Sequence, residues 1–593
     1  MYFTLAISAS TRQRCAALIG AAQATDPRVM PIPGPVQVGW RAPDERTAVL
    51  HWGPDVSSDR AGTSHAGTIW ISPAPAVLRA RTGLARVDPV YLAETPGAVV
   101  VSDRASWTAA VVGRLDDHDP VMTGAYLSLG YPTGAATPFR GVRAMPAGHS
   151  LLVAGGRTVI ARADGDQAEA GDVAGARRVA AALVEAVRPL AEETVPVELS
   201  LTGGKDSRLI AAALTAAGVP FRARTHGFAT DPDVIIAGMI AERLGLEHTV
   251  TEPRAAAAGQ DPQPPDQAAD QAADQAADQA AAAGQPPDQG EVLGRLRSAV
   301  LVSDGMLSAF ENIGSWVRAD HEAATERAQA GGHGGELLRG GYAQVAWRSP
   351  APGRPVRPAQ AWSSAAAAEL FRRLTTRRLG LLRPAAAAAY LASLAPWAAA
   401  IGTGPLRALD DFYLANRAGR WSAAARQAYL IRAPLVQPFF SDRVIQAARA
   451  VPLRQRMDDQ LHRDVLASLA PELLGLPLAG HPWHGERATA DNVLTARPGV
   501  SAPADWRRSR ATTGFLRGYV LDFGGAGRLF GIVSRRAAER ALQPPRADPQ
   551  AAWALATLAA LLSGDWLNAR GPVSPPSARQ AQDGSAVNGQ PRP

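Results

Sequence analysis

The 593-residue sequence contains a single cysteine and a single lysine. Because Cys15 is alone, the chain can form neither an internal disulfide framework nor a zinc site of several thiolates, and we expect a cytoplasmic location. Lysine and arginine together number 61, so nearly all of the positive charge is arginine. These arginines are spread along the chain rather than massed in one tract, and the net charge of +7 therefore does not support a nucleic-acid partner.

Long hydrophobic runs are also scarce. The N-terminal stretch MYFTLAISASTRQRC has no basic region followed by a sustained apolar run, so we expect no signal peptide. The longest apolar stretch, residues 384–402, is mostly alanine and is broken by Pro396, which makes it too weakly hydrophobic to predict a transmembrane helix. The sequence therefore predicts no membrane span.

The chain divides into two regions of different pattern. Residues 1–165 contain short strand-like runs between turn residues, which predict a β-rich domain: RTAVLHWG, AGTIWIS, GAVVVSD and HSLLVAGG. Residues 175–570 alternate alanine-rich helical segments with brief β-branched runs, as βαβ units around a parallel sheet do. Residues 255–290 repeat Asp-Gln-Ala-Ala and residues 571–593 form a polar tail. Neither can supply a core, so we expect both to be disordered.

The only lysine lies in the stretch ELSLTGGKDSRLI, residues 198–210, between a predicted strand and a predicted helix that starts at Ser207 and ends at Gly218. A glycine loop that enters a helix N-terminus presents backbone N–H groups and the positive helix end to a phosphate. Lys205 would add a positive charge, and we expect it to be a catalytic residue. Asp206 would accept a magnesium ion bridging two phosphates. The expected phosphate-binding set from this loop is Leu201, Thr202, Gly203, Gly204, Asp206 and Ser207.

The spacing of this loop excludes a Walker loop, which needs four residues between its glycines. It resembles instead the Ser/Thr-Gly-Gly-x-Asp-Ser loop of the pyrophosphate-loop ATPases, which form adenylates and release pyrophosphate. The alternative is a glycine-bearing turn between strand and helix that binds no ligand.

Over most of its length the chain resembles the asparagine synthetase family. FRARTHGF and the helix that begins at Pro232 and Asp233 look like the family's second strand and helix. This resemblance implies that Thr225 and Gly227 lie at the edge of an ATP pocket and that Asp233 lies near the phosphates.

A second motif, GHGGELLRGGY at residues 332–342, is similar in spacing to the family's Gly-Glu-Gly-Ser-Asp-Glu-x-Phe-Gly-Gly-Tyr. The resemblance implies that Gly332 contacts the nucleotide and that Glu336 is a second metal-binding acid. Two carboxylates, Asp206 and Glu336, could hold one Mg²⁺, which a single carboxylate would bind poorly. His333 stands where the family keeps a base, and an imidazole with an ordinary pKa of about 6.5 suits that role. The alternative is a loop histidine that caps a helix or faces water.

The resemblance also implies the fold. The segment from Asp119 to Val153 looks like the second half of the glutaminase domain, an Ntn-type αββα fold, followed by an α/β synthetase domain of the adenine nucleotide alpha hydrolase-like type. Glutamine-using members place a nucleophilic cysteine directly after the initiator methionine. Residue 2 is Tyr2 here, and Cys15 lies thirteen positions later. Unless translation starts elsewhere, we expect no release of ammonia from glutamine.

A degenerate glutaminase domain joined to an intact loop is the arrangement of the β-lactam synthetase and lasso-peptide cyclase branches. It implies an ATP- and Mg²⁺-dependent ligase of specialised metabolism that joins a carboxylate to an amine of a small molecule or peptide. One alternative is asparagine synthesis from ammonia or glutamine. Another is an inactive nucleotide-binding homologue, favoured because the family's later lysine is missing and Leu337 replaces an acid. The sequence leaves the substrates and the oligomeric state open, a homodimer included.

Overall fold

The computed structural model describes most of the chain. The described residues are 4–8, 40–44, 47–52, 67–73, 76–95, 98–154, 157–162, 175–193, 196–251, 288–311, 328–344, 364–430, 435–495, 505–522, 527–545 and 547–568. Nearly all of the Asp-Gln-Ala-Ala segment, the whole of the C-terminal tail and the expected boundary between the two domains lie outside these residues.

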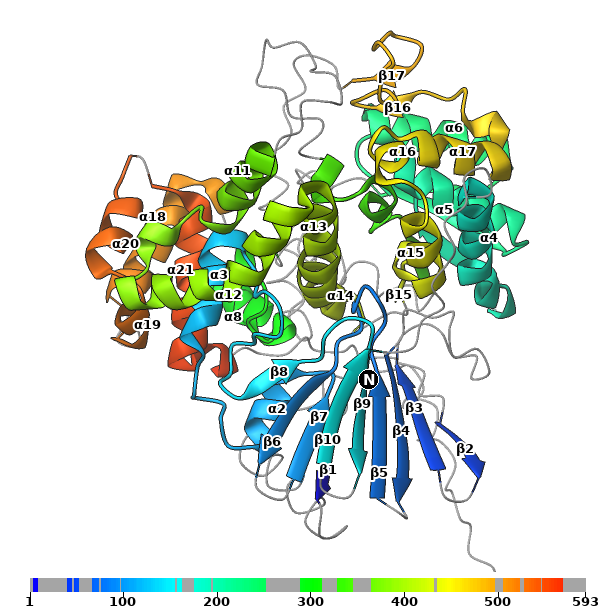
Figure 1. The fold of residues 1–593 in the computed structure, drawn as a ribbon. Coiled ribbons are helices and arrows are strands. Elements are labelled where there is room, and N and C mark those ends of the chain that lie inside the picture. Colours follow the sequence, from blue (N-terminus) through cyan, green and yellow to red (C-terminus); the bar gives the residue numbers. More distant parts are fainter. Residues whose placement is uncertain are drawn as a thin grey trace, which may run out of the picture.

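The N-terminal region contains two antiparallel sheets, drawn at the bottom of Figure 1. The first has the order β1 (Thr4–Ser8), β7 (Ala98–Ser102), β6 (Tyr91–Thr95) and β8 (Val142–Ala144). The second has the order β10 (Arg157–Arg162), β9 (His149–Ala154), β5 (Ala76–Arg81), β4 (Gly67–Pro73), β3 (Thr47–Trp52) and β2 (Trp40–Asp44). The four strand-like runs form β3, β4, β7 and β9, which confirms a β-rich region.

The two sheets share a small apolar core. Its buried side chains come from both sheets and from the turns between their strands: Ala80, Val90, Leu92, Val101, Met145, Leu151 and Val153. The helix α2 (Ala105–Val111) contacts β6, β7 and β8. Alternating exposure along β9 fits a strand with one face on this core.

The second region is built on a five-stranded parallel sheet, as the βαβ pattern predicts. Its order is β13 (His248–Thr251), β12 (Phe221–His226), β11 (Val197–Ser200), β14 (Gln329–Gly331) and β15 (Leu435–Val436). The chain adds strands to one side of β11 first and to the other side afterwards. The strand order therefore reverses between β11 and β14, where Ser200 pairs with Gly331. Ligands of open parallel sheets bind beyond the carboxyl ends of the strands at such a point.

Helices cover this sheet and bury apolar side chains against it, at the upper right of Figure 1. They are α4 (Gly175–Val187), α5 (Lys205–Ala216), α6 (Pro232–Leu244), α15 (Asp442–Arg449) and α17 (Gln460–Leu469). α5 begins at Lys205 rather than at the predicted Ser207, because Gly204 already provides the extended N-cap. α6 ends at Gly245 in the left-handed conformation, as expected of a glycine C-cap.

A third group of helices packs around Trp553 and its neighbours. The group includes α3 (Pro120–Leu129), α8 (Gln289–Ser303), α12 (Pro384–Thr403), α14 (Ala423–Leu430), α18 (Arg510–Asp522) and α21 (Pro549–Ser563). α11 (Ser364–Thr375) and α13 (Pro405–Phe412) pack with α12 in a separate core that contains Tyr390 and Phe412. Between α13 and α14 the chain continues as the π-helix Tyr413–Ser422. Among the described helices, α12 alone is long and apolar enough to cross a membrane by length and composition. That is weak support for a span, because core helices meet the same test, and α12 contacts α3, α11 and α13.

Buried polar contacts join the β-rich region to the rest of the molecule. The fully buried Arg426 pairs with Asp88 at 3.1 Å, and Arg104 pairs with Asp304. The backbone N–H of Leu84 donates to Asp442 Oδ1 at 2.6 Å.

This junction gives a pH-dependent prediction at Asp442, whose side chain is 5% exposed. Burial raises its pKa to about 6, although the Leu84 N–H and Arg81 oppose that shift. Between an unfolded pKa of about 3.9 and the folded value, the folded state holds more protons, so stability falls as pH rises through this window. The ionised carboxylate should cost at most about 3 kcal/mol at pH 8.

Asp442→Asn keeps an acceptor for Leu84 without the charge. We expect it to unfold at a higher temperature than wild type at pH 8 and at a similar temperature at pH 4.5, measured by thermal unfolding. A variant that is less stable than wild type at pH 8 would contradict this account of Asp442.

Candidate functional site

The loop after β11 is closed by its own side chains. The Thr202 N–H donates to Ser207 Oγ at 3.1 Å, and the Gly204 N–H donates to Thr202 Oγ1 at 3.2 Å. The Gly203 N–H donates to Asp233 Oδ1 at 2.8 Å, so α6 holds the loop in place. The first turn of α5 follows directly, and N–H groups in a first turn have no carbonyl partner within their own helix. The result is a preformed turn with a helix N-terminus available to an anion.

The second motif packs directly on this loop. A β-carbon placed on Gly332 would lie 2.6 Å from the backbone nitrogen of Ser207. A β-carbon on Gly335 would overlap the carboxyl group of Asp206. These two glycines therefore allow the segment after β14 to pack against the first turn of α5, and they bring the 3₁₀ turn Gly335–Arg339 beside it.

Asp206 lies at the centre of this contact with its side chain 22% exposed. Its Oδ2 accepts a hydrogen bond from Arg339 Nη2 at 2.7 Å, and its Oδ1 lies 2.9 Å from His462 Nε2. Burial would raise the pKa of Asp206, but Arg339 and His462 outweigh that effect and lower it. Burial lowers the pKa of His462 below its usual value, so this ring is neutral at pH 7 and its Nε2–H donates to Asp206.

The predicted metal ligands, Asp206 and Glu336, do not fit a divalent ion in this arrangement. Both oxygens of Asp206 already accept hydrogen bonds, and one of the donors is a cation. No cluster of three histidine, cysteine, aspartate or glutamate residues suited to a metal occurs within the described part of the chain. Glu336 contributes a buried oxygen, Oε2, that has no hydrogen-bond partner among the described residues.

His333 is the second residue of the second motif and lies just after the end of β14. Its Nε2 lies 2.9 Å from Ser422 Oγ at the end of the π-helix. Its ring packs against Trp421 and Phe440, with centroids 5.7 and 5.6 Å away. The imidazole is therefore held in one orientation rather than left as a solvent-facing loop side chain.

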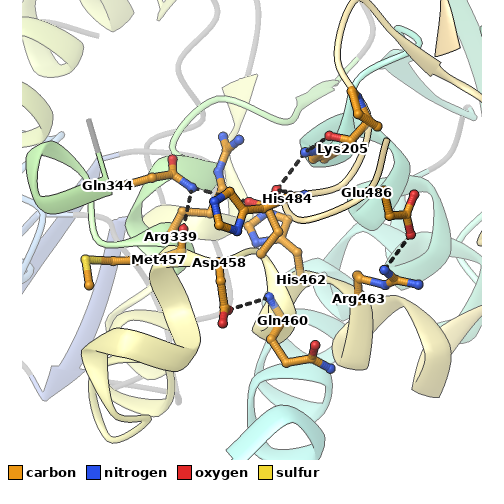
Figure 2. A network of polar contacts seen from close by, with 12 residues as sticks. Lys205, Arg339, Gln344, Met457, Asp458, Gln460, His462, Arg463, His484 and Glu486 are labelled. Carbon is orange, nitrogen blue, oxygen red and sulfur yellow. Dashed lines mark hydrogen bonds and ion pairs between the residues drawn. The ribbon is translucent and has the colours of Figure 1, made fainter. Parts of the chain in front are cut away.

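The lone lysine is tied to a buried acid. Lys205 Nζ donates to Asp459 Oδ2 at 2.7 Å and to the Pro482 carbonyl at 3.0 Å, and it lies 5.0 Å from the Trp483 ring. Asp459 is completely buried and also accepts from Gln344 Nε2 and the His484 N–H. Figure 2 shows this network, with Gln344, His484 and Lys205 on different segments and with Arg339 and His462 close by.

The predicted pocket-edge residues, Thr225 and Gly227, lie at the end of β12. Thr225 is buried, and its hydroxyl donates to the Leu201 carbonyl at 2.8 Å. Gly227 has φ of 151°, and a β-carbon there would lie 2.8 Å from Asp231 Oδ2. The Thr225 hydroxyl is thus used within the protein, and residue 227 has room for glycine alone beside Asp231.

Three residues at the site escaped prediction: Arg339, His462 and Asp459. Arg339 stands in the second motif where the family pattern has phenylalanine, and this change of residue type was a signal that could have identified it. His462 and Asp459 lie on α17 and at its N-cap, in the stretch MDDQLH. Their distance in sequence from Asp206 gave no indication of contact.

Comparison with known families finds a match for the part of the chain that contains the 202–207 loop. Residues 178–281 match the family model described as asparagine synthase. The matched stretch contains β11, the 202–207 loop, α5, β12, α6 and β13, and it indicates ATP-dependent ligase chemistry of the asparagine synthase type. His333, Glu336 and Arg339 lie beyond it. No curated protein matches the chain.

Proposed function

We propose that the chain is an ATP-dependent amide-forming ligase that activates a substrate carboxylate as an acyl-adenylate. The observation that carries this proposal is the strand-loop-helix at residues 197–216, closed by Thr202 and Ser207 and positioned at the point where the strand order reverses. Its location fits phosphate binding, and the family match covers it.

In the first step a substrate carboxylate oxygen attacks the α-phosphorus of ATP, and pyrophosphate leaves. The N–H groups of the first turn of α5 bind the leaving phosphates, while the N–H groups of the loop are donated within the protein and hold the loop in shape. Gly203 and Gly204 let those phosphates approach the backbone. Asp233 contributes by fixing Gly203, and Ser207 by fixing Thr202.

In the second step an amine attacks the acyl carbon of the mixed anhydride, and AMP leaves as the amide forms. The amine must lose a proton, and His333 accepts it. A base of this kind is most effective when its orientation is fixed, and the contacts with Ser422, Trp421 and Phe440 supply that orientation.

His333→Ala should therefore slow amide formation much more than adenylation, by roughly 10²–10⁴-fold. Pyrophosphate exchange measures the first step and single-turnover amide formation measures the second. His333→Gln tests whether a neutral hydrogen-bonding side chain can replace the imidazole. An equal loss of both steps in His333→Ala would contradict a base role.

The amine does not come from glutamine in this proposal. We assign the two antiparallel sheets to a degenerate glutaminase-like domain, because β8 and most of β9 lie in the segment from Asp119 to Val153 that resembles the second half of that domain. The expected setting is specialised metabolism, with a small-molecule or peptide carboxylate and an amine as substrates. Asparagine formation from free ammonia would use the same two steps.

A nucleotide-binding protein without catalytic activity is the second candidate. It is favoured by the two hydrogen bonds that already occupy Asp206, which a catalytic carboxylate would have to give up to bind a metal.

Exchange of labelled pyrophosphate into ATP separates these candidates. The purified chain is assayed with ATP, Mg²⁺ and a panel of amino acids, dicarboxylic acids and peptides. Exchange should depend on one class of acid, and Asp206→Ala and Glu336→Ala should abolish it. Glu369→Gln, at an exposed acid that pairs with its helix neighbour Arg372, is the matched control and should exchange as wild type does. Absence of exchange with every acid, together with undiminished ATP binding in both alanine variants, would contradict the ligase and favour the second candidate.

A further inference from the structure

Arg339 is the positive charge beside both predicted metal-binding acids. Its Nη2 donates to Asp206 Oδ2 at 2.7 Å, and its guanidinium interacts electrostatically with Glu336 three residues earlier. Burial would lower the pKa of Arg339, but Asp206, Glu336 and Asp459 outweigh that effect and raise it. The acids thus already have a cation that is always charged.

The same group of atoms has unused hydrogen-bonding capacity. Arg339 Nε and Glu336 Oε2 are both buried, and neither has a hydrogen-bond partner within the described ranges. An unpaired buried donor or acceptor is costly in a native protein and calls for an explanation such as a missing ion or ligand. Here the donor and the acceptor lie on one turn, next to the phosphate-binding loop.

The turn fixes where the guanidinium lies. The residues on either side of Gly335–Arg339, Gly334 and Gly340, both have a left-handed backbone, and Arg339 is 14% exposed. Moving the guanidinium away would leave the neutral His462 as the side-chain partner of Asp206 among the described residues. Asp206 and Glu336 would then lie near each other without the charge of Arg339 between them.

We propose that Arg339 is the resident cation of this site, so that its guanidinium takes the place of a protein-held divalent metal ion and contacts the pyrophosphate directly. The inference rests on the proposed function for the identity of the anion. A guanidinium presents several donors in one plane and binds phosphate oxygens bidentately. Metal ions in solution would then reach the site only with the nucleotide, and Asp206 and Glu336 would serve to position Arg339.

The first test measures metal binding without nucleotide. Mn²⁺ is added to the full chain and free Mn²⁺ is followed by electron paramagnetic resonance. Wild type should bind little Mn²⁺, because Arg339 competes for the carboxylates. Arg339→Leu, which leaves both acids uncompensated, should bind Mn²⁺ at least about tenfold more tightly. Adding Glu336→Gln to Arg339→Leu should remove the gain, and Arg372→Leu, an exposed arginine, is the matched control.

The second test measures the anion with metal removed. In EDTA, inorganic pyrophosphate should bind wild type by calorimetry, and Arg339→Leu should weaken this binding by about tenfold or more. Arg339→Lys should retain part of it because the charge remains. Mg²⁺ alone should raise the unfolding temperature of Arg339→Leu but not that of wild type.

Tight Mn²⁺ binding by wild type that Glu336→Gln removes would overturn the inference, even if Arg339→Leu fails to fold. Equal pyrophosphate binding by wild type and Arg339→Leu would also overturn it. These outcomes leave pyrophosphate exchange untouched, so the ligase would stand. Conversely, the absence of pyrophosphate exchange together with Arg339-dependent pyrophosphate binding would contradict the ligase proposal and would support Arg339 as the resident cation.

Discussion

Gly332→Ala should abolish nucleotide binding and pyrophosphate exchange, whereas Gly331→Ala, at the adjacent position, should leave both near wild type. A β-carbon on Gly332 would lie 2.6 Å from Ser207 N and 2.8 Å from the carbonyl carbon of Asp206. Both are backbone atoms of the phosphate-binding turn, so the clash cannot be relieved by rotating a flexible side chain. The loop itself must move, and overpacking of this kind typically costs about 1–3 kcal/mol.

Gly331 provides a control of the same chemistry. It is the last residue of β14, and a β-carbon there would meet no atom within 4 Å. Its φ is not positive, so alanine is compatible with its backbone. Calorimetric ATP binding and thermal unfolding of both variants test the prediction. Normal ATP binding by Gly332→Ala, or equal losses in both variants, would show that the close approach of β14 to the loop is not what forms the site.

Asp459→Asn should destabilise the fold by about 3–5 kcal/mol and weaken ATP binding, because it removes the buried charge that pairs with Lys205 Nζ at 2.7 Å. The Lys205 side chain is 9% exposed, so water compensates little of the loss. Asparagine is the appropriate replacement because residue 459 has φ of +66°, a conformation that asparagine adopts more readily than most residues. Asp459 also joins Gln344 and His484 to Lys205, so its charge holds three segments around the loop.

A double-mutant cycle separates the pair from its surroundings. Lys205→Met should be destabilising alone, and Lys205→Met combined with Asp459→Asn should recover much of the loss, a coupling of about 2 kcal/mol or more in denaturant unfolding. Lys205→Arg keeps the charge but not the geometry of an ammonium, so we expect reduced turnover. Additive single-variant losses would contradict a coupled pair, and unchanged turnover in Lys205→Arg would show that the lone lysine is incidental to catalysis.

The parts of the fold that depend on local sequence could be predicted from sequence. The strand β11, the glycine loop and α5 follow from an apolar run, two glycines and a helical pattern within twenty residues. The left-handed end of α6 follows from Gly245. The start of α5 at Lys205 was predicted two residues late, because a glycine N-cap gives a weaker signal than serine or aspartate.

The arrangement of the site could not be derived from local patterns. Asp206 contacts Arg339 and His462, which lie 133 and 256 residues further along the chain. The resemblance predicted roles for Glu336 and His333, because the family has functional residues at those positions. It predicted none for Arg339, because the family has a phenylalanine there. The role of Asp459 could not be predicted either, because two adjacent acids are common at the start of a helix. Its burial, which the structure shows, distinguishes it from an ordinary helix-start acid.

The measurement that tests the central claim most directly is the fate of doubly labelled ATP. The purified chain is incubated with ATP labelled at the α- and γ-phosphates, Mg²⁺ and the acid that supports exchange, together with candidate amines. Adenylation predicts that the α-label appears in AMP, that the γ-label appears in pyrophosphate, and that Gly332→Ala produces neither while Gly331→Ala produces both. Formation of ADP and inorganic phosphate by wild type, or bound ATP that stays intact with every acid and amine, would contradict an adenylating site at residues 202–207.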